Sequence, residues 1–125
     1  MIYKYLVPIF DKTFIYDVWS CRKGKGLQGA IERAQFFAKQ YAHGFVWRTD
    51  IKKFFDSVNQ EILFKCIERR VSHLPTLHII REIITSYKII DLKDEKKMFP
   101  TFSTGIPIGN LTSQIFSNIY FNEFD

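Results

Sequence analysis

Asp50 is the residue of this chain best placed to take part in chemistry, because its carboxylate closely follows an apolar run. Residues 44–47, Gly-Phe-Val-Trp, are rich in strand formers, so Asp50 is expected where a buried strand reaches the surface. A carboxylate on a rigid strand end can bind Mg²⁺, which takes its remaining oxygen ligands from water and substrate phosphates. An Asp in this position is also a common turn former or helix cap, so the local sequence leaves both roles open.

Two glycine-containing stretches could bring backbone amides close to phosphate groups. The run 22–26, Arg-Lys-Gly-Lys-Gly, places three cations beside two glycines, and Arg22 and Lys25 are its best candidates for phosphate contacts. The stretch 105–120 begins with a turn in which Gly109 would let a nucleotide approach the backbone, near the start of a helix. Simpler interpretations stay open: a solvated basic turn for the first stretch, and a plain chain reversal for the second.

The charge distribution favours the N-terminal region as the phosphate-facing part. The net charge is +5, and residues 1–49 account for all of it, with eight Lys or Arg against three acidic residues. Residues 50–125 hold ten of each sign. Such an asymmetry fits a surface that meets nucleic acid, although a bias of this size is also common on ordinary protein surfaces.

Helices are expected to position most of these residues. Apolar side chains recur at spacings of three and four, which predicts helices over about 27–41, 60–70, 75–87 and from 111 onward. Residues 1–20 suggest short irregular or extended pieces, and the charged run 91–97 suggests an exposed loop or hairpin tip. With 125 residues, 46% of them hydrophobic, the chain is long enough for one packed unit.

The cysteines and histidines point to no metal site. Cys21 and Cys66 form no CxxC pair and the three histidines show no ligand spacing, so neither a zinc site nor a disulfide framework is expected. This small number of cysteines is consistent with the reducing environment of the cytoplasm. The sequence also has no apolar run long enough to span a membrane.

Taken in this order, the stretches 48–57 and 105–120 resemble motifs A and B of reverse transcriptases. The family's metal-binding aspartate, its bulky nucleotide-gate residue and its nucleotide-binding loop and helix fall on Asp50, on Phe55, and on Pro107, Gly109 and Ser113. The resemblance covers most of the chain, because segments 7–12 and 21–26 are similar to fingers segments of the same enzymes.

Within the family, the run Ile-Gly-Asn-Leu-Thr-Ser-Gln at 108–114 is most similar to bacterial retroelement enzymes of the diversity-generating type. Group II intron and retron enzymes more often carry Gln-Gly and Ser-Pro where this chain has Ile108-Gly109 and Ser113-Gln114. The difference favours the diversity-generating type without excluding other relatives.

The resemblance implies an α+β fold, the fingers and partial palm of a right-hand polymerase, with residues 1–125 as a single unit. It implies RNA-templated transfer of dNTPs by two Mg²⁺ ions, with Asp50 as the catalytic residue and Asp50 and Ile51 as metal ligands. The implied substrate contacts are Arg22, Lys25, Phe55, Ile108, Gly109 and Ser113. The implied partners are an RNA template, a primer and a dNTP in the bacterial cytoplasm, with self-association through an incomplete palm surface.

The resemblance also implies that part of the catalytic centre is missing. Two Mg²⁺ ions about 4 Å apart need carboxylates from more than one segment. In the family a Tyr-x-Asp-Asp hairpin follows motif B, and this sequence ends at residues 121–125 before such a hairpin. We therefore expect the 125-residue chain to be inactive by itself. The alternative is a non-catalytic nucleic-acid-binding or assembly module with a polymerase-derived fold.

Overall fold

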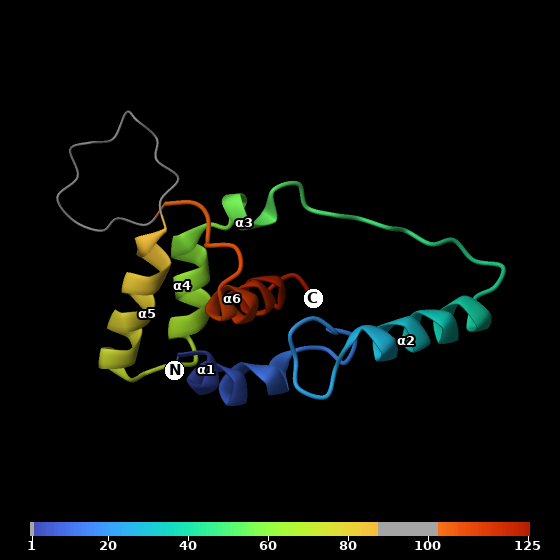
Figure 1. Cartoon of the computed structure of the whole chain (residues 1–125), viewed down its shortest axis with the longest axis horizontal. Coiled ribbons are helices and arrows are strands. Elements are labelled where there is room, and N and C mark those ends of the chain that lie inside the picture. Colours follow the sequence, from blue (N-terminus) through green and yellow to red (C-terminus); the bar gives the residue numbers. More distant parts are fainter. Residues whose placement is uncertain (1, 88–102) are drawn as a thin grey trace.

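The computed structural model describes residues 2–87 and 103–125. Within these ranges the chain forms helices and no β-strand (Figure 1). The elements are α1 (Ile2–Phe10), the 3₁₀ helix η1 (Asp11–Thr13), α2 (Leu27–Gln40), α3 (Phe54–Ser57), α4 (Gln60–Glu68), α5 (Leu74–Ser86) and α6 (Leu111–Phe121). None of the helices in the described ranges is long and apolar enough to cross a membrane. The loop predicted at 91–97 lies outside the described residues.

Four helices pack together into a helical body, in which α6 contacts both α1 and α4, and α4 also contacts α5. The side chains that meet inside it are apolar, and each large one stabilises the fold by roughly 1.5–3 kcal/mol when it leaves water. The fully buried members include Leu6, Leu63, Ile67, Ile80, Ile84, Ile106, Phe116 and Ile119.

The expected α+β fold, with fingers and a partial palm, is wrong for the described residues, which are mostly helical and form no sheet. Their one strand-like contact is an isolated antiparallel bridge between Asn59 and Thr104. The strand predicted at 44–47 pairs with no described segment, and its Phe45 and Trp47 side chains are almost fully exposed. Strand-forming residues favour an extended backbone, but a strand exists only where a second segment supplies hydrogen-bond partners.

Residues 2–10 form α1, which corrects the expectation of short irregular or extended pieces at the N-terminus. Leu6 and Phe10 lie four residues apart, on one face of the helix, and both are buried in the core. Pro8 lies inside α1 and removes one backbone donor from it. Packing of the Leu6–Phe10 face therefore outweighs the local penalty of the proline.

The three helices α4, α5 and α6 agree with the predicted periodicity, and a polar side chain caps each of them. Asn59, His73 and Asn110 each accept a hydrogen bond from a backbone N–H in the first turn of the helix that follows. These bonds satisfy donors that have no partner inside the helix. Asn110 therefore fixes where the turn at 105–109 ends and α6 begins.

The helix predicted from Leu27 is present as α2, but none of its residues is buried. In Figure 1, α2 and the extended chain that follows it project away from the helical body before the chain returns to α3. The apolar side chains of α2, such as Phe36, therefore remain exposed. The sequence pattern predicted the helix correctly, but the described residues supply no surface that covers it.

Candidate functional site

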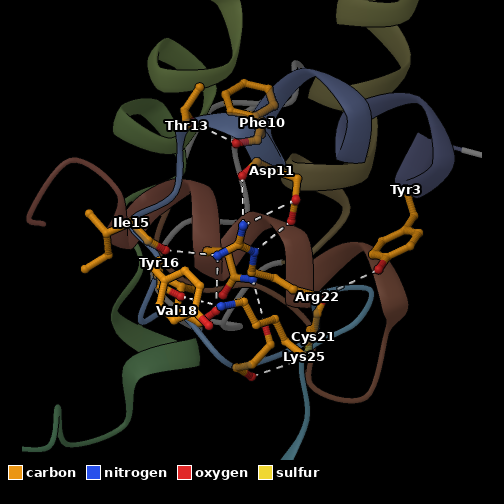
Figure 2. A network of polar contacts seen from close by, with 12 residues as sticks. Tyr3, Phe10, Asp11, Thr13, Ile15, Tyr16, Val18, Cys21, Arg22 and Lys25 are labelled. Atoms are coloured by element: carbon orange, nitrogen blue, oxygen red, sulfur yellow. Dashed lines mark hydrogen bonds and ion pairs between the residues drawn. The ribbon is translucent and has the colours of Figure 1, made fainter. Parts of the chain in front are cut away.

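Arg22 is the centre of a polar network in the loop between η1 and α2 (Figure 2). Its guanidinium donates to the two Asp11 carboxylate oxygens at 2.8 and 3.3 Å. It also donates to the backbone carbonyl oxygens of Asp11, Ile15 and Val18 at 3.1, 3.0 and 3.2 Å. A guanidinium has five N–H groups, and these five hydrogen bonds use all of them. In this structure Arg22 shapes the loop and has no N–H left for a phosphate.

Lys25 packs against two aromatic rings of the same loop. Its Nζ donates to the Tyr16 carbonyl oxygen at 2.7 Å and lies 3.4 and 4.1 Å from the ring centroids of Tyr16 and Trp19. The hydrogen bond and the cation–π attraction both hold the ammonium group on the loop. Lys23, by contrast, is exposed and has no polar partner among the residues that the structure describes. Lys23 is therefore the cation of this run that a phosphate could reach without breaking a contact.

An open cavity of about 400 Å³ lies between this loop and the start of α2. Gly26 is the N-cap of α2 and offers no side-chain cap, so the first amides of the helix have no side-chain acceptor. The Lys25 ammonium group also lines the cavity, and a positive charge beside such amides suits a polar or anionic ligand. The lining residues are Trp19, Ser20, Cys21, Arg22, Lys25, Gly26, Leu27 and Ala30.

An ion pair connects this loop to α2. Arg33 donates to the two carboxylate oxygens of Asp17 at 2.8 and 3.1 Å. Its guanidinium also lies over three aromatic rings, 4.3 Å from the nearest centroid, that of Phe37. The hydrogen bond from Arg33 lowers the pKa of Asp17, and the same bond raises the pKa of Arg33. The orientation of α2 therefore depends on contacts with the loop.

The loop is also attached to α1 and α6. Asn118 donates from Nδ2 to the Ser20 carbonyl oxygen at 2.9 Å, and the Tyr3 hydroxyl donates to the Cys21 carbonyl oxygen at 3.4 Å. Asn118 lies about 12 Å along the axis of α6 from the Asn110 cap, at a rise of about 1.5 Å per residue. The basic loop therefore docks far along α6 from the turn at 105–109, and Arg22 and Lys25 are not brought to that turn.

Phe55, in contrast, lies beside the turn at 105–109, although the two are far apart in the sequence. Ile106 N donates to the Phe55 carbonyl oxygen at 2.7 Å, and Gly105 N donates to the Val58 carbonyl oxygen at 2.8 Å. The Phe55 ring is half-buried and meets the Phe54 ring edge to face, with 5.4 Å between centroids. The structure therefore joins the predicted nucleotide gate to the predicted nucleotide-binding loop.

Two glycines of this turn have left-handed backbones in very different surroundings. Gly105 has φ +96°, and a Cβ atom there would lie 2.6 Å from the Tyr87 ring. Gly109 has φ +84°, and its Cβ position has no neighbour within 4 Å among the described residues. The adjacent Ile108 side chain is 73% exposed. Ile108 and Gly109 thus form an open edge of the turn, where a ligand could contact the backbone.

Ser113, the third predicted contact in this region, is not accessible. It lies in α6 with 1% of its surface exposed, and its Oγ has no hydrogen-bond partner in the described part of the chain. A small side chain at this position lets α6 pack closely in the helical body, at the expense of one unsatisfied hydroxyl. A nucleotide at the turn could therefore reach Ile108 and Gly109 but not Ser113.

Asp50 and Ile51 lie in the exposed extended segment between α2 and α3. Asp50 has no polar partner among residues 2–87 and 103–125, and these ranges contain no group of three His, Cys, Asp or Glu side chains that could hold a metal ion. One carboxylate and the Ile51 carbonyl supply too few oxygens for two Mg²⁺ ions. The donors in this part of the chain therefore do not fit a two-metal centre.

Gln60 is a buried polar residue at the turn that the sequence pattern does not reveal. Its side-chain amide donates to the Gly105 carbonyl oxygen at 2.9 Å. The sequence places Gln60 at the start of a predicted helix, where polar residues are usual. Only the approach of residues 103–105 to α4 makes it a buried bridging residue.

No protein-family model matches this chain, and no solved structure matches it. The chain is similar to the protein YkfC of Escherichia coli (strain K12), with 32% identity over 121 residues. That alignment covers 94% of this chain and 30% of YkfC. The chain therefore spans less than a third of the length of the curated relative that it matches.

Proposed function

We propose that this chain is part of an RNA-directed DNA polymerase and is inactive by itself. The observation that carries the proposal is the contact between Phe55 and the turn at 105–109. Two stretches that resemble motifs A and B meet there, through the 2.7 Å hydrogen bond from Ile106 N to the Phe55 carbonyl oxygen. Motif order and this contact support the proposal, and the helical fold of the described residues contributes nothing to it.

At this contact, Phe55 and the edge formed by Ile108 and Gly109 would receive the incoming dNTP. The open space beside Gly109 leaves its backbone approachable, which a side chain at that position would hinder. Phe55 would limit the room beside the sugar. Asp50 would contribute one carboxylate, with the Ile51 carbonyl, to a Mg²⁺ site whose other carboxylates come from outside the described residues.

The basic loop would serve the RNA template and primer through their phosphates. Arg22 would act by holding the loop in shape, because its donors are already used within the chain. Lys25 would present its charge at the mouth of the cavity, and the exposed Lys23 would contact phosphate directly. Such contacts carry no sequence information, so binding would be general for nucleic acid.

Primer extension on an RNA template, with Mg²⁺ and dNTPs, tests the proposal. The assay compares the 125-residue chain, the full-length product of its gene, and that product carrying Asp50→Asn. The substitution keeps the side-chain shape and removes the charge. Asp125→Asn is the matched control, because it makes the same chemical change at an exposed carboxylate outside the proposed site.

We expect synthesis by the full-length product and by the Asp125→Asn control, and none by the Asp50→Asn variant or by the 125-residue chain. Synthesis by the 125-residue chain would show that its carboxylates suffice, against the ligand count given above. Undiminished synthesis by the Asp50→Asn variant would remove Asp50 from the site. A full-length product that binds the primer–template and does not extend it would refute the polymerase proposal.

A second candidate, a non-catalytic nucleic-acid-binding or assembly module, is favoured by the exposed apolar surface of α2 and of the chain that follows. No residue of α2 is buried, and Phe45 and Trp47 are almost fully exposed. Surfaces of this kind usually meet another protein surface. This candidate predicts self-association of the 125-residue chain in sedimentation experiments, together with nucleic-acid binding and no synthesis by the full-length product.

A further inference from the structure

Gln60 is fully buried at the start of α4, with 0% of its surface exposed. Its side-chain Nε2 donates to the carbonyl oxygens of Tyr87, at 2.7 Å, and Gly105, at 2.9 Å. Its Oε1 accepts from the backbone N–H of Ser103 at 2.9 Å and from the Ser103 hydroxyl at 3.3 Å. One side chain therefore contacts the end of α5 and both sides of Thr104.

These contacts match the full hydrogen-bonding capacity of a primary amide, which has two N–H donors and two lone pairs on its oxygen. Glu has the same length but lacks the donors when ionised. Met has the same length and lacks both functions, and Asn is shorter by one methylene group. Gln60 is thus the side chain that fits this set of partners.

The backbone around Gln60 extends the same connection to the turn. Gln60 N donates to the Ser103 carbonyl oxygen at 3.1 Å, and Gly105 N donates to the Val58 carbonyl oxygen at 2.8 Å. The next residue, Ile106, donates to the Phe55 carbonyl oxygen. Hydrogen bonds with residues at and just before the start of α4 therefore fix the position of the turn relative to Phe55.

We propose that Gln60 is a positioning residue that holds the turn at 105–109 against Phe55, so that the open edge at Gly109 faces the nucleotide. The effect on the nucleotide rests on the proposed function, whereas the effect on the turn does not. Without the amide, the carbonyl oxygens of Gly105 and Tyr87 lose buried donors, and the turn shifts to recover partners.

Amide hydrogen exchange in the 125-residue chain tests the effect on the turn. Gln60→Met removes every polar contact of the side chain, and Gln60→Glu keeps the acceptor and removes the donors. Gln40→Glu is the matched control, because Gln40 is an exposed residue of α2. We expect protection of the Gly105 and Ile106 amides to fall by about tenfold or more in both Gln60 variants, the effect of losing one or two buried hydrogen bonds.

The Leu63 amide, which donates at 3.0 Å to the carbonyl oxygen of Asn59, the N-cap of α4, is the internal reference. Its protection should stay within about twofold of the wild type in the Gln60→Glu variant. Unchanged protection at Gly105 and Ile106 would overturn the proposal. Equal loss of protection at Leu63 in both variants would also overturn it, because Gln60 would then serve the helix as a whole.

Kinetics of the full-length product test the effect on the nucleotide. We expect Gln60→Glu to raise KM for dATP by about tenfold while kcat changes less, because the turn contacts the nucleotide and not the metal. A fall in kcat of about tenfold with an unchanged KM would refute this step. If the wild-type product neither binds nor incorporates dATP, the proposed function fails, and exchange at Gly105 still decides the role of Gln60.

Discussion

The substitution Gly105→Ala should destabilise the fold strongly, because both the backbone and the surroundings of Gly105 exclude a side chain. Its φ of +96° lies in the left-handed region that Ala rarely adopts. A Cβ atom would also lie 2.6 Å from Tyr87 Cε1 and 3.4 Å from the Asp56 carbonyl oxygen. Movement of the ring is opposed because the Tyr87 hydroxyl donates to Asp56 Oδ1 at 3.4 Å and the Tyr87 carbonyl oxygen accepts from Gln60.

The expected loss of unfolding free energy has two parts. The left-handed backbone costs a non-glycine residue about 1–2 kcal/mol, and forcing an extra methyl group into a packed site costs about 1–3 kcal/mol. Gly105→Ala should therefore lower the unfolding free energy by about 2–5 kcal/mol. That is a large share of the roughly 5–15 kcal/mol that stabilises a typical domain.

Gly109→Ala separates the two parts, because Gly109 shares the left-handed backbone, with φ +84°, and has no neighbour near its Cβ position. It should lose only the backbone part, about 1–2 kcal/mol. Urea denaturation of both variants, followed by circular dichroism at 222 nm, measures the difference. Equal destabilisation of the two variants would refute the claim that the Tyr87 ring excludes a side chain at Gly105.

Three further predictions concern single side chains. The hydrogen bond from Arg33 lowers the pKa of Asp17 below its ordinary 3.8, so the pair stabilises the fold above that pH and loses its effect as the pH falls through the lower, folded-state value. Asp17→Asn should therefore weaken the fold at neutral pH in urea titrations, and its difference from the wild type should shrink as the pH falls below 3.8; a difference that does not shrink in acid would contradict this. Burial raises the pKa of the Cys66 thiol, whereas Cys21 is exposed. A thiol reagent at neutral pH should therefore modify Cys21 alone until urea unfolds the chain. Mass spectrometry of the peptides measures this, and a Cys66 adduct formed before unfolding would contradict it. In the full-length product, Phe55→Ala should raise incorporation of rNTPs relative to dNTPs in primer extension, and an unchanged ratio would leave Phe55 as a packing residue only.

The helices could be predicted from the sequence because their signals are local. The periodicity that predicted a helix over 60–70 corresponds to α4 at Gln60–Glu68, and its predicted buried residues Leu63, Cys66 and Ile67 are buried. Ile62, predicted on the same buried face, is half exposed. Which side of α4 is covered depends on α5 and α6, and spacing within α4 carries no information about their positions.

The predicted strand did not form for a related reason. Residues 44–47 have side chains typical of a strand, yet a strand needs a partner from elsewhere in the chain, and none of the described segments supplies one. Asp50 then lies on an unpaired, exposed segment. The resemblance gave Phe55 and the turn at 105–109 separate roles at a nucleotide, and no local pattern in either stretch predicts that they meet.

The basic run at 22–26 shows why residue type alone assigns phosphate contacts poorly. An arginine is expected to bind phosphate because its guanidinium presents several N–H donors in a fork. The donors of Arg22 instead bind the Asp11 carboxylate and three backbone carbonyl oxygens. Lys25 is likewise held by Tyr16 and Trp19. The cation left exposed is Lys23, and the contacts of its two neighbours fix the loop that presents it. The run at 22–26 therefore holds two cations that shape the loop, Arg22 and Lys25, and between them one cation that faces solvent, Lys23.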